Sequence, residues 1–148
     1  MNYALVALVG AGAVIAIAGN VRIVYANHLE HSGINYFVHK LPEQANKDFR
    51  TALSVDQPYI GDLRLRYVQA LSQSVSQMEI PDVKDHIQFS IDELKNAMVT
   101  DPFNYFNYYA LADAKLLFGA VSNKFYNGSE SDIRKAMELS PNRQLNYY

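Results

Sequence analysis

The sequence contains no cysteine and no tryptophan, and its first 29 residues include a single charged side chain, Arg22. Without cysteine the chain forms no disulfide, thiolate metal site or thiol nucleophile. All 15 Asp and Glu residues and the other 12 of the 13 Lys and Arg residues lie in residues 30–148, which makes that part mildly acidic. Nucleic acid requires a basic face, so we expect no nucleic-acid partner.

Motifs typical of catalysis are also missing. The sequence has no glycine-rich phosphate loop, no GxSxG and no HExxH. His28 and His31 could share one helix face, but zinc needs a third and usually a fourth ligand, so we interpret them as surface or interfacial histidines. Asp92-Glu93 is interpreted as part of a solvated helix face. The sequence therefore predicts no enzyme, no cofactor and no metal site.

The amino-terminal segment is apolar. Residues 1–21 contain no Asp, Glu, Lys, Arg or His, and a helix of that length spans roughly 31 Å, the thickness of a bilayer's hydrocarbon core. A cleaved signal peptide ending at Ala16-Ile17-Ala18 is the alternative, but no Lys or Arg precedes the apolar run. We expect residues 1–26 to form a hydrophobic anchor or assembly helix of transmembrane type, and residues 27–41 to form a linker.

Small residues recur at spacings of four within this segment. Such spacing lets helix backbones approach closely in lipid, although an Ala/Gly-rich spanning segment needs no specific partner. The candidates for helix packing are Ala7, Ala11, Gly12 and Ala16.

From residue 42 onward the apolar residues have helical spacing. One face carries Ala45, Phe49, Ala52 and Leu53; a second carries Val83, Ile87, Ile91, Leu94 and Met98. Asp101-Pro102 and Ser129 with Asp132 are typical of helix starts. Residues expected to break helices stand between these runs, namely Pro42, Pro58, Pro81, Pro102, Gly119, Gly128 and Pro141. The pattern predicts an all-α fold.

Three segments of this region repeat one another: FRTALSVDQPYI (49–60), LKNAMVTDPFNY (94–105) and IRKAMELSPNRQ (133–144). Each has an apolar residue, an alanine three later, a polar turn and a proline. The interval is 45 residues from Ala52 to Ala97, and 39 from Ala97 to Ala136. Periods of this size predict stacked helix pairs.

These residues resemble a tetratricopeptide repeat. Ala45-x3-Phe49-x2-Ala52 is similar to the signature of that repeat's second helix, Pro102 stands at its closing proline, and Tyr108-x2-Leu111-Ala112 is similar to the opening of the next first helix. The resemblance implies antiparallel helix pairs over residues 42–148 and says almost nothing about the ligand. It departs from the family in its longer repeats and at Arg64, where a large apolar residue is usual.

A narrower resemblance is to the last span and carboxyl-terminal region of bacterial O-antigen ligase or polymerase-like membrane proteins. It is carried by the apolar segment, PYIGDLRLRYVQAL and LSPNRQLNYY. It implies an accessory or truncated relative, because the many-span catalytic domain of those enzymes is not in this sequence. The final Tyr147-Tyr148 stands where a further helix would begin, which predicts a fragment or a helix completed by another copy.

Aromatic residues cluster after Pro102. Tyrosine is favoured at interfaces because it offers a large rigid area with a polar tip, although most of this cluster is expected to fill the core between repeats. The candidate partner contacts are Tyr105, Tyr108, Tyr109, Leu139, Arg143, Tyr147 and Tyr148. Asn127-Gly128-Ser129 is a glycosylation sequon, and the same residues favour a simple turn.

The leading hypothesis is a non-enzymatic, membrane-anchored helical-repeat module of the cell envelope that binds a protein partner or self-associates. One alternative is a subunit of an extracellular filament with residues 1–26 in the packed core. The other is an accessory or carboxyl-terminal part of an O-antigen ligase-like polysaccharide enzyme.

Overall fold

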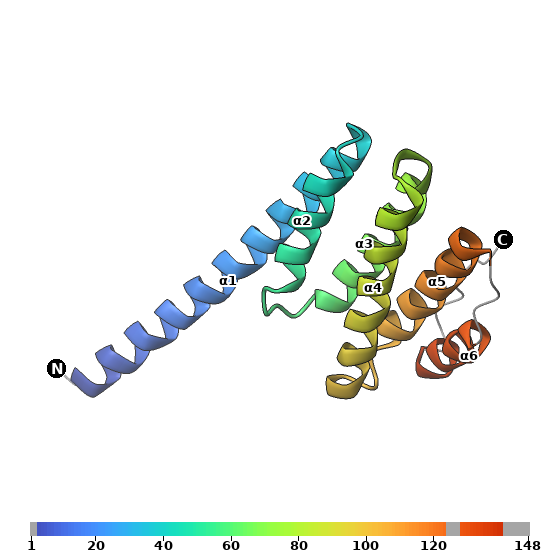
Figure 1. Ribbon diagram of the computed structural model, residues 1–148. Coiled ribbons are helices and arrows are strands. Elements are labelled where there is room, and N and C mark those ends of the chain that lie inside the picture. The colour runs from blue at the N-terminus through green and yellow to red at the C-terminus, as the bar shows by residue number, and fades with distance from the viewer. Residues whose placement is uncertain (1–2, 124–127, 141–148) are drawn as a thin grey trace.

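The computed structural model describes residues 3–123 and 128–140, with the side chains of residues 3–10, 77, 80 and 81 excepted. Within these residues the chain consists of helices joined by turns, with no strand, which confirms the predicted all-α class. The elements are α1 (Tyr3–Val38), α2 (Pro42–Leu53), α3 (Ile60–Ser74), the 3₁₀ turn η1 (Val75–Gln77), α4 (Ile80–Thr100), α5 (Tyr105–Ser122) and α6 (Ser129–Leu139). Figure 1 shows α1 to α5 running alternately up and down, and α3 packs against α5 as well as against α4.

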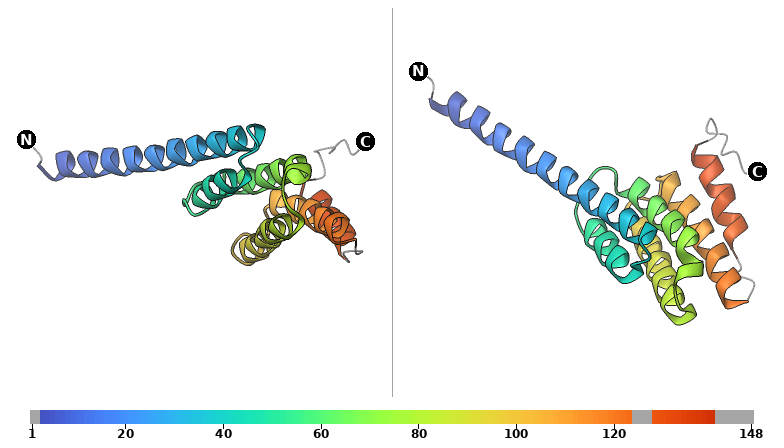
Figure 2. Two further views of the ribbon diagram at one scale, coloured as in Figure 1. Left: turned by 45° about the horizontal axis from the view of Figure 1, so that its top comes forward. Right: turned by 90° about the horizontal axis from the view of Figure 1, so that it is seen from above.

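Helix α1 is much longer than its neighbours. Its carboxyl-terminal part packs against α2, while its amino-terminal part projects away from the bundle (Figures 1 and 2). Among the described residues, none of the helices combines the length and the apolar character that a membrane crossing requires. The transmembrane part of the prediction for residues 1–26 is therefore unsupported.

The prediction of a linker at residues 27–41 is wrong for residues 27–38. Residues 27–38 continue α1, and a face of this helix with a spacing of three or four residues is buried at Ala26, Glu30, Gly33 and Phe37. Only one of these four residues is large and apolar, so the amphipathic pattern is hidden from a hydrophobicity-based analysis. The turn to α2 begins at His39, and Lys40 adopts a positive φ of 60°.

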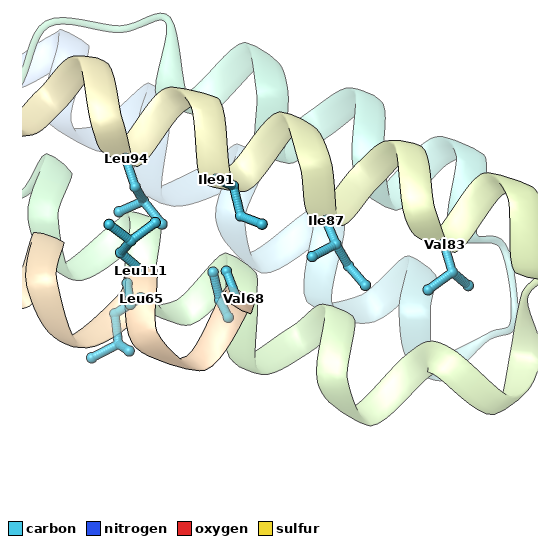
Figure 3. Packing of buried hydrophobic residues seen from close by; sticks show 9 residues of the cluster. Leu65, Val68, Val83, Ile87, Ile91, Leu94 and Leu111 are labelled. Carbon is cyan, nitrogen blue, oxygen red and sulfur yellow. The ribbon is translucent and has the colours of Figure 1, made fainter. Parts of the chain in front are cut away.

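Two hydrophobic clusters hold the bundle together, and α3 contributes to both. The first joins α1, α2 and α3 around Phe49 and Tyr67. The second joins α3, α4 and α5, with the side chains of α4 pointing toward Leu65, Val68 and Leu111 (Figure 3). Both predicted apolar faces are confirmed, because the residues of the first and all but the partly buried Met98 of the second lie in the core.

Two predicted helix boundaries are wrong. Gly119 lies inside α5, which ends at Ser122 with Asn123 in the left-handed conformation (φ 51°). A glycine within a helix costs only about 1 kcal/mol relative to alanine, so packing overrides it. Helix α5 also starts later than Asp101-Pro102 predicts, because the side chain of Asn104 caps it by accepting a hydrogen bond from the Phe106 N–H.

The alanines shared by the repeated segments occupy corresponding places. Ala52, Ala97 and Ala136 are all buried, and they lie near the carboxyl ends of α2, α4 and α6. Small side chains at these positions allow each helix to approach its neighbour closely. This correspondence is compatible with a stack of helix pairs.

Candidate functional site

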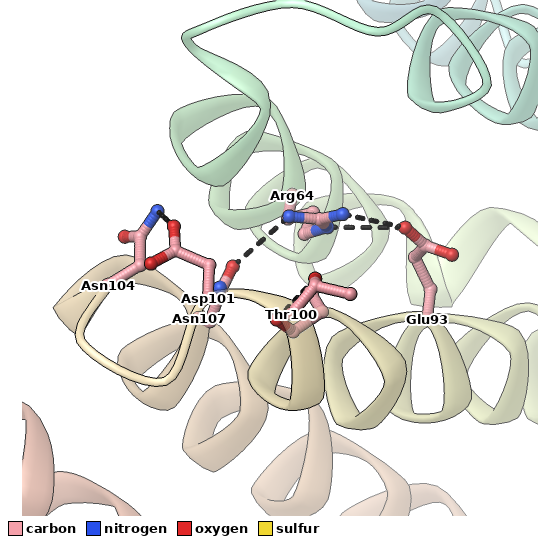
Figure 4. Close-up of polar contacts among 7 residues, drawn as sticks. Arg64, Glu93, Thr100, Asp101, Asn104 and Asn107 are labelled. Carbon is pink, nitrogen blue, oxygen red and sulfur yellow. Dashed lines mark hydrogen bonds and ion pairs between the residues drawn. The ribbon is translucent and has the colours of Figure 1, made fainter.

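A polar network joins α3, α4 and α5 at the end of the bundle where α5 begins (Figure 4). Arg64 donates from Nε and Nη2 to Oε1 of Glu93, at 3.2 and 3.0 Å, and from Nη1 to Oδ1 of Asn107 at 3.4 Å. The Arg64 side chain is largely buried, so these acceptors offset the loss of its hydration. Arg64 is the residue at which the tetratricopeptide resemblance implies an apolar side chain.

Glu93 and Asn107 were not identified from the sequence. The predicted solvated face at Asp92-Glu93 is wrong for Glu93, whose carboxylate turns toward α3 to meet Arg64. A basic residue at a predicted core position was the one available signal, because a buried guanidinium requires acceptors on neighbouring helices. Because the Arg64 guanidinium already has hydrogen-bond acceptors on α4 and α5, we interpret this network as structural.

A second charged cluster connects α1 with α3. Arg66 donates to Oε1 of Glu30 on α1 at 3.0 Å and to Oδ2 of Asp62 at 2.9 Å. The nearby Glu30 carboxylate raises the pKa of Arg66. A cavity of about 270 Å³ adjoins these groups and is lined also by His31 and by Gln57, whose Oε1 is buried without a hydrogen-bond partner among the described residues.

Apolar side chains are exposed along α1 where it leaves the bundle. Ile15 is 73% exposed, and the neighbouring exposed apolar residues are Val14, Ile17, Val21 and Val24. Val14, Ile17, Val21 and Val24 are three or four residues apart and so lie on one stripe of the helix, and Ile15 points about 100° away from Val14. An exposed apolar surface of this kind marks contact with a lipid or a protein.

A groove between α3 and α5 contains a carboxylate. It has a volume of about 660 Å³ and is lined by Val68, Gln69, Ser72, Gln73, Asp113, Leu116, Leu117 and Ala120. Burial raises the pKa of Asp113 to about 6. Burial also raises the pKa of Tyr109, and the Asp113 charge adds to that effect. The groove therefore holds a carboxyl group that titrates near neutrality.

The predicted contact residues that the structure describes lie on α5 and α6. Tyr105, Tyr108 and Tyr109 are half-buried on α5, and the Tyr105 ring lies 4.2 Å from that of Phe106. Leu139 is half-buried at the end of α6. These half-buried side chains are divided between packing and surface, so their role in partner contact stays a prediction.

The small residues predicted to pack helices lie on the projecting part of α1. Ala11, Gly12 and Ala16 are exposed, and no atom lies within 4 Å of a Cβ placed on Gly12. Of the remaining predicted residues, Ala7 lies in α1 but its side chain is not described. The others lie outside the described residues: Asn127, Arg143, Tyr147 and Tyr148. His28 and His31 are exposed, and no group of three or more potential metal ligands is found among the described residues.

Comparison of the chain with protein-family models, with curated proteins and with solved structures finds no match.

Proposed function

We propose that this chain is a non-enzymatic interaction and assembly module whose apolar amino-terminal helix attaches it to a membrane of the cell envelope, while the helical bundle binds a protein partner. The exposed apolar surface of α1 outside the bundle carries the proposal. Leaving this surface in water costs roughly 25 cal/mol for each Å² of apolar area, so a surrounding lipid or protein phase would be strongly favoured.

The distribution of charge also supports attachment through this end. Residues 1–21 carry no Asp, Glu, Lys, Arg or His, and the acidic residues begin at Glu30, beside the bundle. An apolar segment next to a soluble charged domain is the arrangement expected of a peripheral or anchored protein. Arg22 lies at the boundary, where its long side chain can reach water while its stem remains in an apolar phase.

A second candidate function is self-assembly into a filament through the same helix. The open space around Gly12 favours it, because a helix from another copy could approach the backbone of α1 closely there. In this case residues 1–26 would be covered by other copies rather than by lipid.

Flotation with neutral phosphatidylcholine vesicles distinguishes these functions. We expect the full chain to float with the vesicles, and the double variant Val14→Asp/Ile17→Asp to stay in the dense fraction, because each Asp in an apolar helix opposes insertion by about 3 kcal/mol. The matched control is Val99→Asp/Phe103→Asp, which places the same charges on two exposed apolar residues of the bundle. This control should float like the parent chain.

Other outcomes have definite meanings. A chain that sediments as regular fibres without vesicles and does not float would replace membrane attachment with self-assembly. A chain that neither floats nor associates in buffer would overturn both functions for α1.

A further inference from the structure

The groove between α3 and α5 has one charged group and several uncharged hydrogen-bonding groups. Asp113 contributes its carboxylate from α5, and Gln69, Ser72 and Gln73 contribute amides and a hydroxyl from α3. Leu116 and Leu117 supply apolar surface beside them. At about 660 Å³ the groove is large enough for a side chain with its flanking backbone, since ligand sites commonly measure 300–1,000 Å³.

Asp113 has no counter-ion among residues 3–123 and 128–140. Among the described residues it accepts no side-chain hydrogen bond and forms no ion pair. Carboxylates other than Asp113 pair with the arginines and lysines on α3, α5 and α6, namely Arg64, Arg66, Lys115, Arg134 and Lys135. Lys84 and Lys95 of α4 form no ion pair with Asp113 among the described residues. Tyr109 is the titratable group whose pKa responds to the Asp113 charge. Within the part of the chain that the structure describes, the carboxylate is therefore held in the groove without the positive charge that normally accompanies a half-buried acid.

We propose that this groove binds an arginine side chain presented by a segment of the partner protein, with the guanidinium on Asp113 and its neighbours contacting Gln69 and Gln73. A guanidinium offers five N–H donors in a planar fork, which matches a carboxylate flanked by amide oxygens better than an ammonium does. The apolar residues Leu116 and Leu117 would cover the methylene stem of the arginine.

The electrostatics of Asp113 agree with this ligand. Burial holds its pKa near 6 because the ionised form is poorly solvated. A bound cation stabilises the ionised form, so binding and deprotonation are coupled. Arginine binding is consequently expected to weaken as the carboxyl group becomes protonated, by about tenfold between about pH 7.5 and about pH 5.

The inference rests on the proposed interaction function, and an NMR titration of the full chain in detergent micelles tests it. The probe is the peptide acetyl-Leu-Arg-Leu-amide, and its counterpart contains citrulline, which has the shape of arginine without the charge. We expect the arginine peptide to shift the amide signals of residues 68–73 and 113–120, and the citrulline peptide to bind about tenfold more weakly.

Two variants complete the test. Asp113→Asn should reduce the affinity for the arginine peptide to that of the citrulline peptide, whereas Asp85→Asn, which removes an exposed charge from α4, should leave it unchanged. Equal binding of the two peptides by the parent chain, or an affinity that does not change between pH 7.5 and pH 5, would overturn the inference even if Asp113→Asn failed to fold. If the chain floats with vesicles but does not bind the peptide, the arginine-binding inference is wrong and membrane attachment stands. If it binds the peptide but does not float, membrane attachment is wrong and the arginine-binding inference stands.

Discussion

The ring of Phe49 on α2 lies directly against the backbone of Gly33 on α1. A Cβ placed on Gly33 would stand 2.7 Å from Cδ2 of Phe49 and 3.3 Å from the carbonyl oxygen of Ala45. The Phe49 ring is fully buried, and its centroid lies 6.0 Å from that of Phe37 and 4.9 Å from that of Tyr67. The ring is thus fixed on several sides, and the close approach of α1 to α2 depends on the absence of a side chain at position 33.

Gly33→Ala is therefore expected to destabilise the bundle by about 1–3 kcal/mol, although alanine favours helix more than glycine does. Urea unfolding followed by circular dichroism measures the change. The control is Gly12→Ala, at a position where a Cβ meets no atom within 4 Å. There the higher helix propensity of alanine alone should change the stability. An unchanged midpoint for Gly33→Ala would show that α2 can shift away from α1 without loss.

The attachment of α6 depends on an ion pair between Lys115 of α5 and Asp132 of α6. Both side chains are nearly buried, and Nζ of Lys115 donates to Oδ2 of Asp132. Lys115→Met leaves the Asp132 carboxylate buried without a partner, so we expect a loss of about 3 kcal/mol and faster hydrogen exchange in α6.

The matched comparison is the exposed pair formed by Arg134 and Glu130 within α6. Arg134→Met should change the stability by less than about 0.5 kcal/mol, because solvent screens an exposed pair. If the double variant Lys115→Met/Asp132→Leu is as unstable as Lys115→Met alone, the unpaired charge is not the cause of the loss.

His86 on α4 is expected to make stability depend on pH. Its Nδ1 lies 3.3 Å from Nη2 of Arg50 on α2, and Arg50 also lies over the Phe89 ring at 4.2 Å. Burial lowers the pKa of His86 below its usual value of 6.5, and the Arg50 charge lowers it further against an opposing effect of Glu43. The unfolded chain therefore binds the proton more tightly than the folded chain does.

It follows that the His86 contribution to stability is fully present above about pH 6.5 and is lost as the pH falls below that value. Thermal unfolding of the parent chain and of His86→Gln between pH 7.5 and pH 5 measures this contribution. The parent should lose more stability than the variant over this interval. Parallel curves for the two proteins would mean that other groups cause the pH dependence.

The sequence predicts helices more reliably than it predicts polar contacts. The faces built on Phe49 and on Ile87 could be predicted because large apolar residues recur at helical spacing, and burial of such residues dominates packing. The continuation of α1 through residues 27–38 could not be predicted in this way, because its buried face consists mainly of the small or polar residues Ala26, Glu30 and Gly33. These residues are buried because of what lies opposite them, such as Phe49 and Arg66, and that information is not local in the sequence.

The groove between α3 and α5 could not be predicted from the sequence either. A single Asp113 in a helix has no pattern that distinguishes it from a solvated acid. Its environment arises only when α3 places Gln69 and Gln73 across from it, residues 40 or more positions earlier in the chain. The aromatic cluster around Tyr108, by contrast, is visible in the sequence, but how its rings divide between core and surface depends on the packing of α5 against its neighbours.

Asp113→Asn is expected to stabilise the protein at neutral and higher pH. Burial raises the folded-state pKa of Asp113 from 3.8 to about 6, so its favourable contribution is present below about pH 3.8 and is lost as the pH rises through 6. Removing the charge should add about 1 kcal/mol at pH 8, a value reduced from the full shift because the group is partly exposed to solvent. Urea unfolding at pH 8 and at pH 5 measures the difference between variant and parent, which should be smaller at pH 5. Asp85→Asn, on the exposed face of α4, should show no such pH-dependent gain. A variant less stable than the parent at pH 8 would mean that the ionised carboxylate already has a stabilising partner, and the groove would then have no charge left for an arginine to neutralise.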